Sequence, residues 1–199
     1  MFTDIVQCKE YFSDLDFNRV LTVNLLIFET KKDLKRNLDR ENRLRIVVGS
    51  KNNRTVVENR KVDVLLSPER GVKKDSLHYR NSGLNQIICR LAQKNKIAIG
   101  FNFNDVLTSK GLKRARTIGR MMQNVKLCRK YKLRMVLGSF ARDKWQMRSK
   151  NDLISFGIVL GMHPEEAQKS LQSVNKILEE KKEEIYKIRE GIKIINTNQ

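Results

Sequence analysis

Residues 82–101 read SGLNQIICRLAQKNKIAIGF, and this stretch predicts a helix followed directly by a strand. Its apolar side chains recur at the i, i+3, i+4 and i+7 spacing of an amphipathic helix: Leu84, Ile87, Ile88 and Leu91. Ser82 has the short hydroxyl side chain typical of a helix N-cap. The apolar run from Ile97 to Phe101 then predicts a short, buried strand.

The same alternation of strand and helix extends to both sides of this stretch. Short apolar runs predict strands at residues 2–6, 20–27, 45–49, 62–66 and 133–138. Helical patterns lie between and after these runs, at residues 31–43, 53–59, 149–160 and about 170–191. One further long helix should turn the following residues toward the core: Leu112, Ala115, Ile118, Met122 and Val125.

This alternation decides the predicted fold class. Apolar strands separated by helices indicate a parallel sheet covered by helices. The chain contains about six or seven strand–helix units, a number that favours a TIM-barrel-like (β/α) fold over a doubly wound sheet. We therefore expect an α/β protein in which residues 1–199 form a single TIM-barrel-like domain with a C-terminal helix at about 170–191.

The charge of the chain points to an anionic partner. Forty-one Lys and Arg residues stand against 22 Asp and Glu residues, which gives a formal net charge of +19. Such a chain repels itself unless a polyanion neutralises part of the charge, so nucleic acid is the favoured partner class. A membrane partner is not expected, because no run approaches the roughly 20 apolar residues of a spanning helix and the N-terminus has no signal-peptide pattern. We predict a cytoplasmic location.

The basic residues concentrate between residues 110 and 150, where Asp143 is the only acidic residue. On the predicted long helix, Lys113, Arg116 and Arg120 share one face at spacings of three and four residues, as a row that follows RNA phosphates would.

Two predicted loops add to this basic surface. They follow the strands at 62–66 and 133–138, and parallel strands would place both loops at the same end of the sheet as one positive rim. Arginine also stacks on unpaired bases and binds phosphate with two hydrogen bonds, which suits folded RNA. The predicted RNA-binding residues are Arg70, Lys73, Lys74, Arg80, Lys113, Arg114, Arg116, Arg120, Arg142, Lys144 and Arg148.

Trp145 is the only tryptophan of the chain and lies among these basic residues. Its ring could stack on an unpaired base or anchor its loop to the core, and we favour the anchor. No RNP, KH or zinc-finger pattern is present, so affinity for RNA should come from shape and charge.

Residues for a protein-borne active site are sparse. His78 and His163 are the only histidines, and neither lies in an HxH or HExxH pattern. Asp4, Asp63 and Asp75 could lie near strand ends and bind a divalent ion, although stabilising a loop is the favoured role. We predict no catalytic and no metal-binding residue. Two alternatives remain open, a metal-dependent phosphoesterase on a related barrel and a basic scaffold for another protein.

Five segments, taken in order, resemble component 3 of archaeal ribonuclease P, a relative of the eukaryotic thirty-kilodalton subunit. They are VDVLLSPE (Val62–Glu69), SGLNQIICRLAQKNKIAIGFNF (Ser82–Phe103), the Arg-rich helix that leads to CRKYKL, GSFARDKWQMRSKNDL and GMHPEEAQKSL. The resemblance covers roughly residues 45–178.

The resemblance implies a fold similar to a TIM barrel and a place in a holoenzyme whose RNA removes the 5′ leader from precursor tRNA. The implied partners are ribonuclease P RNA, precursor tRNA, protein component 2 and other protein subunits of the holoenzyme. The implied enzyme is an endoribonuclease whose catalysis comes from the RNA. The protein would bind no cofactor directly, and Mg²⁺ would lie on the RNA.

Particular residues match the family's motif after the late strand, namely Ser139, Ala141, Trp145 and Arg148, with Asp152 opening the next helix. The chain departs from the family before Arg43, where it looks short, so the barrel is expected to be incomplete or irregular there. Residues 77–80 look like an insertion.

Overall fold

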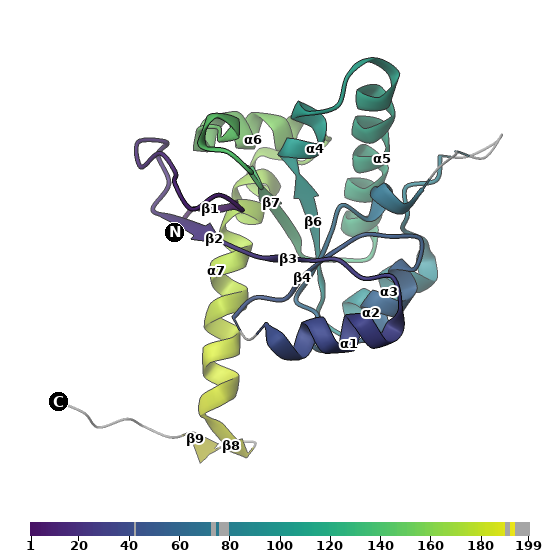
Figure 1. Cartoon of the computed structure of the whole chain (residues 1–199), viewed down its shortest axis with the longest axis vertical. Helices are drawn as coiled ribbons and strands as arrows, with labels where there is room; N and C mark the ends of the chain where they lie inside the picture. The colour runs from purple at the N-terminus through teal and green to yellow at the C-terminus, as the bar shows by residue number, and fades with distance from the viewer. Residues whose placement is uncertain (42, 73–74, 76–79, 190–191, 194–199) are drawn as a thin grey trace.

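The computed structural model describes residues 1–41, 43–72, 75, 80–189 and 192–193 (Figure 1). The strands are β1 (Thr3–Val6), β2 (Arg19–Thr22), β3 (Leu25–Leu26), β4 (Ile46–Val48), β5 (Val64–Leu66), β6 (Ala98–Asn102), β7 (Met135–Gly138), β8 (Lys187–Arg189) and β9 (Ile192–Lys193). The helices are α1 (Lys31–Arg40), α2 (Asn53–Glu58), α3 (Gln86–Lys94), α4 (Phe103–Leu107), α5 (Gly111–Lys130), α6 (Lys150–Val159) and α7 (Pro164–Tyr186), with the 3-10 turns η1 (Pro68–Gly71) and η2 (Lys144–Gln146).

The predicted parallel sheet is confirmed. Five strands pair in the order β3-β4-β5-β6-β7, all parallel, and β1 pairs with β2 in a second parallel pair. The run predicted as one strand at 20–27 is divided into β2 and β3 by two residues. Each of the other strands β1 and β4 to β7 lies within or next to a predicted apolar run.

Neighbouring residues of each central strand pack into different apolar clusters. One cluster lies against the helices and contains Val47, Leu65, Ile99 and Leu137. The other lies on the opposite face of the strands and contains Ile46, Val64, Ala98 and Val136. Burial of both faces explains why these strands are apolar at consecutive positions.

Backbone hydrogen bonds join the two sheets into one barrel-like wall. The Phe140 amide donates to the Ile5 carbonyl at 2.7 Å, and the Gln7 amide donates to the Ala141 carbonyl at 2.8 Å, so β1 lies beside the end of β7. On its other side β1 pairs with β2, which leads directly into β3 of the larger sheet. The fold is therefore TIM-barrel-like, with short strands and an irregular wall where β2 gives way to β3.

A buried carboxylate stabilises the junction between β1 and β7. Asp4 is fully buried, and its carboxylate accepts hydrogen bonds from the Ser139 amide at 2.7 Å, the Ser139 hydroxyl at 2.6 Å and the Ile5 amide at 2.8 Å. Burial raises the pKa of Asp4 to about 6, although these hydrogen bonds favour the charged form. The junction thus combines backbone hydrogen bonds with a buried side-chain contact between residues 135 positions apart.

The helix α7 covers this junction (Figure 1). It begins at Pro164, earlier than the predicted start near residue 170, because proline and the acidic Glu165 and Glu166 suit a first helical turn. Its Val174 and Ile177 pack in the second cluster, while earlier turns pack in the first. Its Asn175 side chain donates to the Thr3 hydroxyl of β1 at 2.6 Å.

Two details of the predicted helices are wrong. Ser82 does not cap α3, because the Asn85 side chain accepts the Ile88 amide at 2.9 Å and starts the helix there; Ile87 is consequently 55% exposed. On α5 the predicted apolar stripe begins too early and is partly on the wrong face, because Met122 is 37% exposed whereas its neighbour Met121 is fully buried. Leu112 is 76% exposed, since residues 111–116 are all exposed at the upper end of the helix in Figure 1, and burial begins at Gly119.

Among the described residues, no helix combines the length and the apolar character needed to cross a bilayer.

Replacing Ser139 with alanine should lower the free energy of unfolding by about 1–3 kcal/mol, because the Asp4 carboxylate loses one donor and stays buried. Urea denaturation measures the change. Ser173→Ala is the matched control, since that hydroxyl donates only within α7, and it should cost less than about 1 kcal/mol. Equal losses for the two variants would contradict a special role for the junction.

Candidate nucleic-acid interface

A pocket of about 540 Å³ lies where the segments after β5, β6 and β7 meet the first half of α5. Five predicted RNA-binding residues line it, Arg70, Lys113, Arg116, Arg120 and Arg142. We call this site the basic pocket. Because β5, β6 and β7 are parallel neighbours, the expectation that the loops after two of them share one end of the sheet is confirmed.

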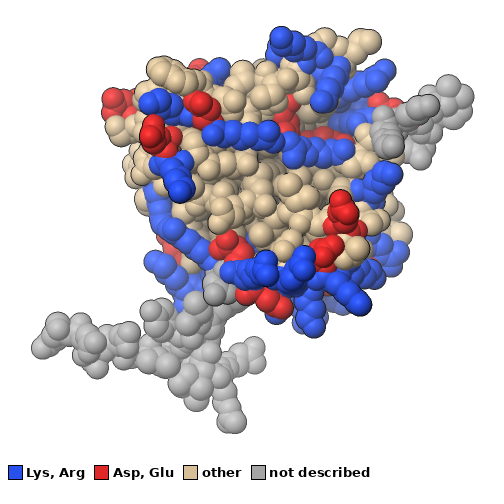
Figure 2. Space-filling model, in the orientation of Figure 1, with Lys and Arg blue, Asp and Glu red and all other residues tan. Residues whose placement is uncertain are grey.

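The surface view shows where positive charge gathers (Figure 2). Lys and Arg side chains lie along the upper edge of this face, where α4 ends and α5 begins, and also along the lower edge. Exposed residues of α1 supply a further basic surface that the sequence analysis did not single out, namely Lys31, Lys32, Lys35, Arg36 and Arg40. The density of Lys and Arg along residues 31–43 is the sequence signal for this surface.

Arg70 is held at the pocket by Asp105. Its guanidinium lies 2.7 Å from the Asp105 carboxylate, which also accepts the Ser67 hydroxyl at 2.7 Å. Ser67 follows β5 in a left-handed conformation, with φ of 49°, which a non-glycine residue rarely adopts. This turn and this ion pair together direct Arg70 into the pocket.

Two of the predicted RNA-binding arginines of α5 are engaged inside the protein. Arg120 is 8% exposed; its guanidinium donates to the Val72 carbonyl at 2.8 Å and to the Asp75 carboxylate at 3.0 Å. Arg114 donates to the carbonyls of Val106, Leu107 and Ser109, where α4 ends. A helix spacing cannot distinguish such internal contacts from free charges, so RNA contact by these two residues stays a prediction.

Lys113, Arg116 and Arg142 are exposed and form no ion pair with another described residue. Lys113 and Arg116 lie one turn apart on α5, and Arg142 reaches the same pocket from the segment after β7. Three cations without a carboxylate partner are available to bind an anion there.

A buried acid lines the same pocket but carries little charge at neutral pH. Glu69 is 4% exposed, and its carboxyl group accepts a hydrogen bond from the side-chain amide of Asn124 at 3.1 Å. Burial raises the pKa of Glu69 to about 8, and the neighbouring Asp105 acts in the same direction. Glu69 is therefore largely protonated at pH 7, so Asp105 is the main negative charge that opposes the arginines of the pocket.

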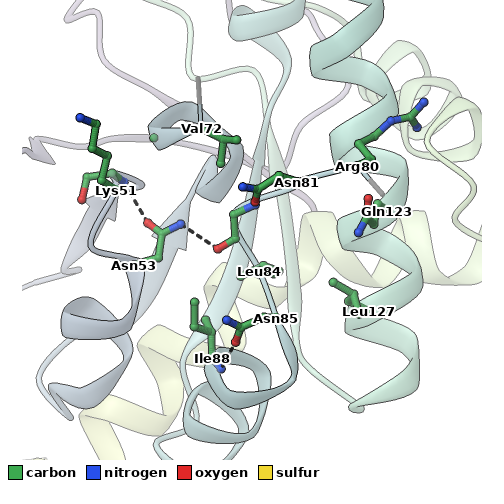
Figure 3. A pocket seen from close by; sticks show the side chains of 13 residues that line it. Lys51, Asn53, Val72, Arg80, Asn81, Leu84, Asn85, Ile88, Gln123 and Leu127 are labelled. Carbon is green, nitrogen blue, oxygen red and sulfur yellow. Dashed lines mark hydrogen bonds between the residues drawn. The ribbon is translucent and has the colours of Figure 1, made fainter. Parts of the chain in front are cut away.

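Arg80 lies at a different pocket, of about 700 Å³, between α3 and α5. Figure 3 shows Asn53 and Asn85 on one side of this pocket and Gln123 and Leu127 on the side of α5. The Arg80 guanidinium donates to the Gly119 carbonyl of α5 at 2.9 Å. Lys73 and Lys74 of the same predicted loop, and His78, lie outside the described residues.

The segment after β7 carries the remaining basic residues. Lys144 approaches Glu10 at 3.5 Å, and Arg148 donates to the carbonyls of Trp145 and Met147 at 3.1 and 2.6 Å. The favoured role of Trp145 as a core anchor is wrong: the side chain is 72% exposed and its ring contacts Phe12. Met147 is the side chain of this segment that is buried, in a small cluster with Val6 and Ala141.

The other matched motif residues have structural contacts. Ser139 forms the junction with Asp4, and the buried Ala141 accepts two amides of the segment that follows β1. Asp152 opens α6 as the resemblance implies, by forming a capping box with Ser149.

The three aspartates considered as metal ligands do not converge. Asp4 bonds to Ser139, Asp63 pairs with Lys181 at 2.5 Å, and Asp75 pairs with Arg120 at 3.0 Å. Across the described part of the chain, no three His, Cys, Asp or Glu side chains are grouped as a metal site would require. Each carboxylate instead stabilises a junction or loop, the role favoured from the sequence.

Comparisons with known proteins agree on one protein family. The model of the family described as RNase P subunit p30 matches residues 36–185. Ribonuclease P protein component 3 of Methanosarcina mazei is 33% identical over 144 residues, which are 72% of this chain and 57% of that protein. The protein of the same name from Methanocaldococcus jannaschii is 34% identical over 125 residues, 63% of this chain and 50% of that protein. The chain thus spans about half the length of the curated relatives it matches.

One similar solved structure is a chain in a cryo-EM structure of archaeal Ribonuclease P with mature tRNA. The TM-score is 0.74 and the sequence identity is 25%, over 99% of this chain and 89% of that chain. This similarity over nearly the whole length supports the barrel-like arrangement of the strands.

The two arginines one turn apart on α5 should differ in their effect on stability. Arg120→Ala should lower the free energy of unfolding by about 1–3 kcal/mol, because it removes the donor that the Val72 carbonyl and the Asp75 carboxylate share and leaves Asp75 with the Asn81 amide alone. Arg116→Ala, at an exposed position, should change it by no more than about 0.5 kcal/mol. Urea unfolding of the two variants measures this, and equal effects would contradict the internal role of Arg120.

Glu69→Gln should remove a pH dependence of stability. An acid whose pKa is higher in the folded state than its ordinary value of 4.5 binds more protons when folded, so stability falls as pH rises from about 4.5 to about 8. Each pKa unit corresponds to about 1.4 kcal/mol. The free energy of unfolding of the wild type should therefore drop relative to that of Glu69→Gln across this range.

Unfolding curves at pH 5, 6, 7 and 8 in the same anion-poor buffer measure this difference. Glu29→Gln, at an exposed position, controls for the loss of one carboxyl group. Parallel pH profiles for the wild type and Glu69→Gln would show that Glu69 ionises normally.

Proposed function

The chain belongs to the RNase P subunit p30 family, and we propose on this basis that it is a protein subunit of ribonuclease P. In that role it assists the catalytic RNA of this endoribonuclease in removing the 5′ leader from precursor tRNA. The names of its relatives and the similarity to a chain of an archaeal ribonuclease P structure support the assignment.

The basic pocket is the observation in the chain itself that carries the proposal. Lys113, Arg116 and Arg142 converge there without carboxylate partners among the described residues, and Arg70 is positioned beside them. Such a site binds the phosphates of folded RNA by charge and by paired hydrogen bonds. Binding there lowers the repulsion between RNA segments, so that the RNA folds and holds its substrate and Mg²⁺ at lower salt.

The proposal assigns no catalytic step to the protein. The Asp and Glu side chains described above stabilise the barrel and its loops, and the Mg²⁺ of the reaction is proposed to lie on the RNA. The proposed partners are ribonuclease P RNA, precursor tRNA, protein component 2 and other protein subunits of the holoenzyme. A cytoplasmic location remains part of the proposal.

Reconstitution tests the role directly. Cleavage of precursor tRNA by the cognate ribonuclease P RNA with component 2 is measured at low Mg²⁺, with and without this chain. Cleavage should require the chain, and the proteins without RNA should be inactive. Hydrolysis by the chain alone, abolished by chelation and by Asp63→Asn, would instead support the metal-dependent phosphoesterase.

Removal of the free cations of the pocket should weaken RNA binding in a salt-dependent way. The triple variant Lys113→Ala, Arg116→Ala, Arg142→Ala should reduce the slope of log K against log salt by about 2, since each phosphate contact contributes roughly 0.7–0.9. Filter binding of ribonuclease P RNA measures the slope. The salt series runs from about 50 to about 300 mM, where RNA affinity falls steeply with salt.

The matched control removes three exposed lysines of α1, Lys31, Lys32 and Lys35. Its net charge is the same as that of the pocket variant, so a nonspecific effect of charge would change both slopes equally. Such an outcome would place the RNA contact elsewhere on the surface.

A further inference from the structure

Trp145 is exposed to an extent that packing does not explain. Its side chain is 72% exposed, whereas large aromatic rings normally bury most of their surface. It lies in the short turn η2, directly after the segment that carries Arg142 into the basic pocket. An exposed ring at this place is a candidate contact for a ligand.

The backbone that presents this ring is fixed on both sides. The Trp145 amide donates to the Asp143 carboxylate at 2.9 Å, and the Trp145 carbonyl accepts the Arg148 guanidinium at 3.1 Å. Arg148 in turn lies over the ring of Phe103, with its guanidinium carbon 5.8 Å from the centroid. The ring therefore extends from an ordered turn, which lowers the entropy lost when a ligand binds.

The ring is supported without being covered. Phe12 meets it at a centroid distance of 5.3 Å and an interplanar angle of 67°, which is an edge contact and not a parallel stack. The Lys144 ammonium lies 5.7 Å from the ring centroid. With 72% of the side chain still exposed, area remains for a flat group to stack on the indole.

The surrounding charge indicates which flat group this is. Lys144 and Arg148 flank Trp145 in the sequence, but Lys144 approaches Glu10 at 3.5 Å and Arg148 donates to two backbone carbonyls. The exposed cation of this segment whose side chain has no such partner among the described residues is Arg142, and its backbone amide is hydrogen-bonded to the Gln146 side chain of the same turn at 3.1 Å. Aromatic rings among cations are typical of sites for single-stranded nucleic acid, where bases stack and phosphates pair with the charges. A protein partner with an apolar surface would gain less from these cations.

We propose that Trp145, supported by Phe12, is a stacking site for an unpaired nucleobase of RNA whose backbone phosphates lie in the adjoining basic pocket. The inference rests on the proposed function, because it adds base contact to the same RNA-binding face. It assigns the exposed ring a role in distinguishing unpaired from paired RNA, which the pocket's cations do not do.

Because Trp145 is the only tryptophan, its fluorescence reports on this ring alone when excitation is selective for indole. The probes are a single-stranded oligoadenylate and an abasic ribose-phosphate oligomer of equal length and charge. Oligoadenylate should quench the emission as it binds, and the abasic oligomer should bind with little quenching. Equal quenching by both oligomers would overturn the proposal.

Variants of Trp145 test how much stacking on this ring contributes to the affinity for RNA. Trp145→Ala should weaken oligoadenylate binding roughly 5- to 100-fold, the range that base–aromatic stacking supplies, and should leave binding of the abasic oligomer unchanged. Trp145→Tyr should restore most of the loss. Ile27→Ala, at another exposed apolar residue with 68% exposure, should bind both oligomers as the wild type does. Unchanged oligoadenylate binding by Trp145→Ala would overturn the stacking site.

Component 2 supplies the last arm of the experiment. Quenching by component 2 but not by oligoadenylate would show a protein contact and overturn the base-stacking proposal. Failure of the proposed function can be told apart from failure of the stacking site. In that case precursor-tRNA cleavage would not require the chain at all. Cleavage that requires the chain, combined with an unquenched Trp145, refutes only the stacking site.

Discussion

The buried carboxylate of Asp4 is the contact on which the arrangement of the functional surface depends. It receives both the amide and the hydroxyl of Ser139 and so joins the first strand to the end of β7. The segment that follows β7 then continues past β1, where Ala141 accepts two further amides. Arg142 and Trp145 start from this fixed point, so their positions follow from the junction.

The basic surface consists of arginines with two different roles. Arg114 and Arg120 donate to carbonyls and a carboxylate of the chain, and they hold the end of α4 and the segment after η1 in place. Arg116 and Arg142 have no such partner among the described residues and remain available. The internally bonded arginines shape the pocket, while the free ones give it an affinity for anions. Protonation of Glu69 strengthens the positive electrostatic potential of the basic pocket, since a second carboxylate would oppose that potential.

Much of the fold can be predicted from local sequence patterns, but the candidate site can be predicted only in part. Apolar runs such as residues 62–66 predict strands because burial on both faces leaves few polar positions. The face of α5 was misjudged because periodicity describes a helix and not what lies beside it, and its first turns have no core to cover. Arg120 and Arg116 are equivalent in sequence spacing, and only the segment at Val72 makes one of them internal. A single tryptophan among polar residues carries no periodicity that tells a core anchor from an exposed ring, and Trp145 is 72% exposed.

The 135-residue separation between Asp4 and Ser139 also has a consequence for how the chain folds. β1 is synthesised well before β7 and can pair early with β2, but its second edge stays unpaired until β7 has left the ribosome. Contacts so distant in sequence slow folding, because a long loop must close before they contribute. β1 is thus among the last strands to complete its pairing, and until β7 is available the unpaired backbone edge of β1 is open to other strands.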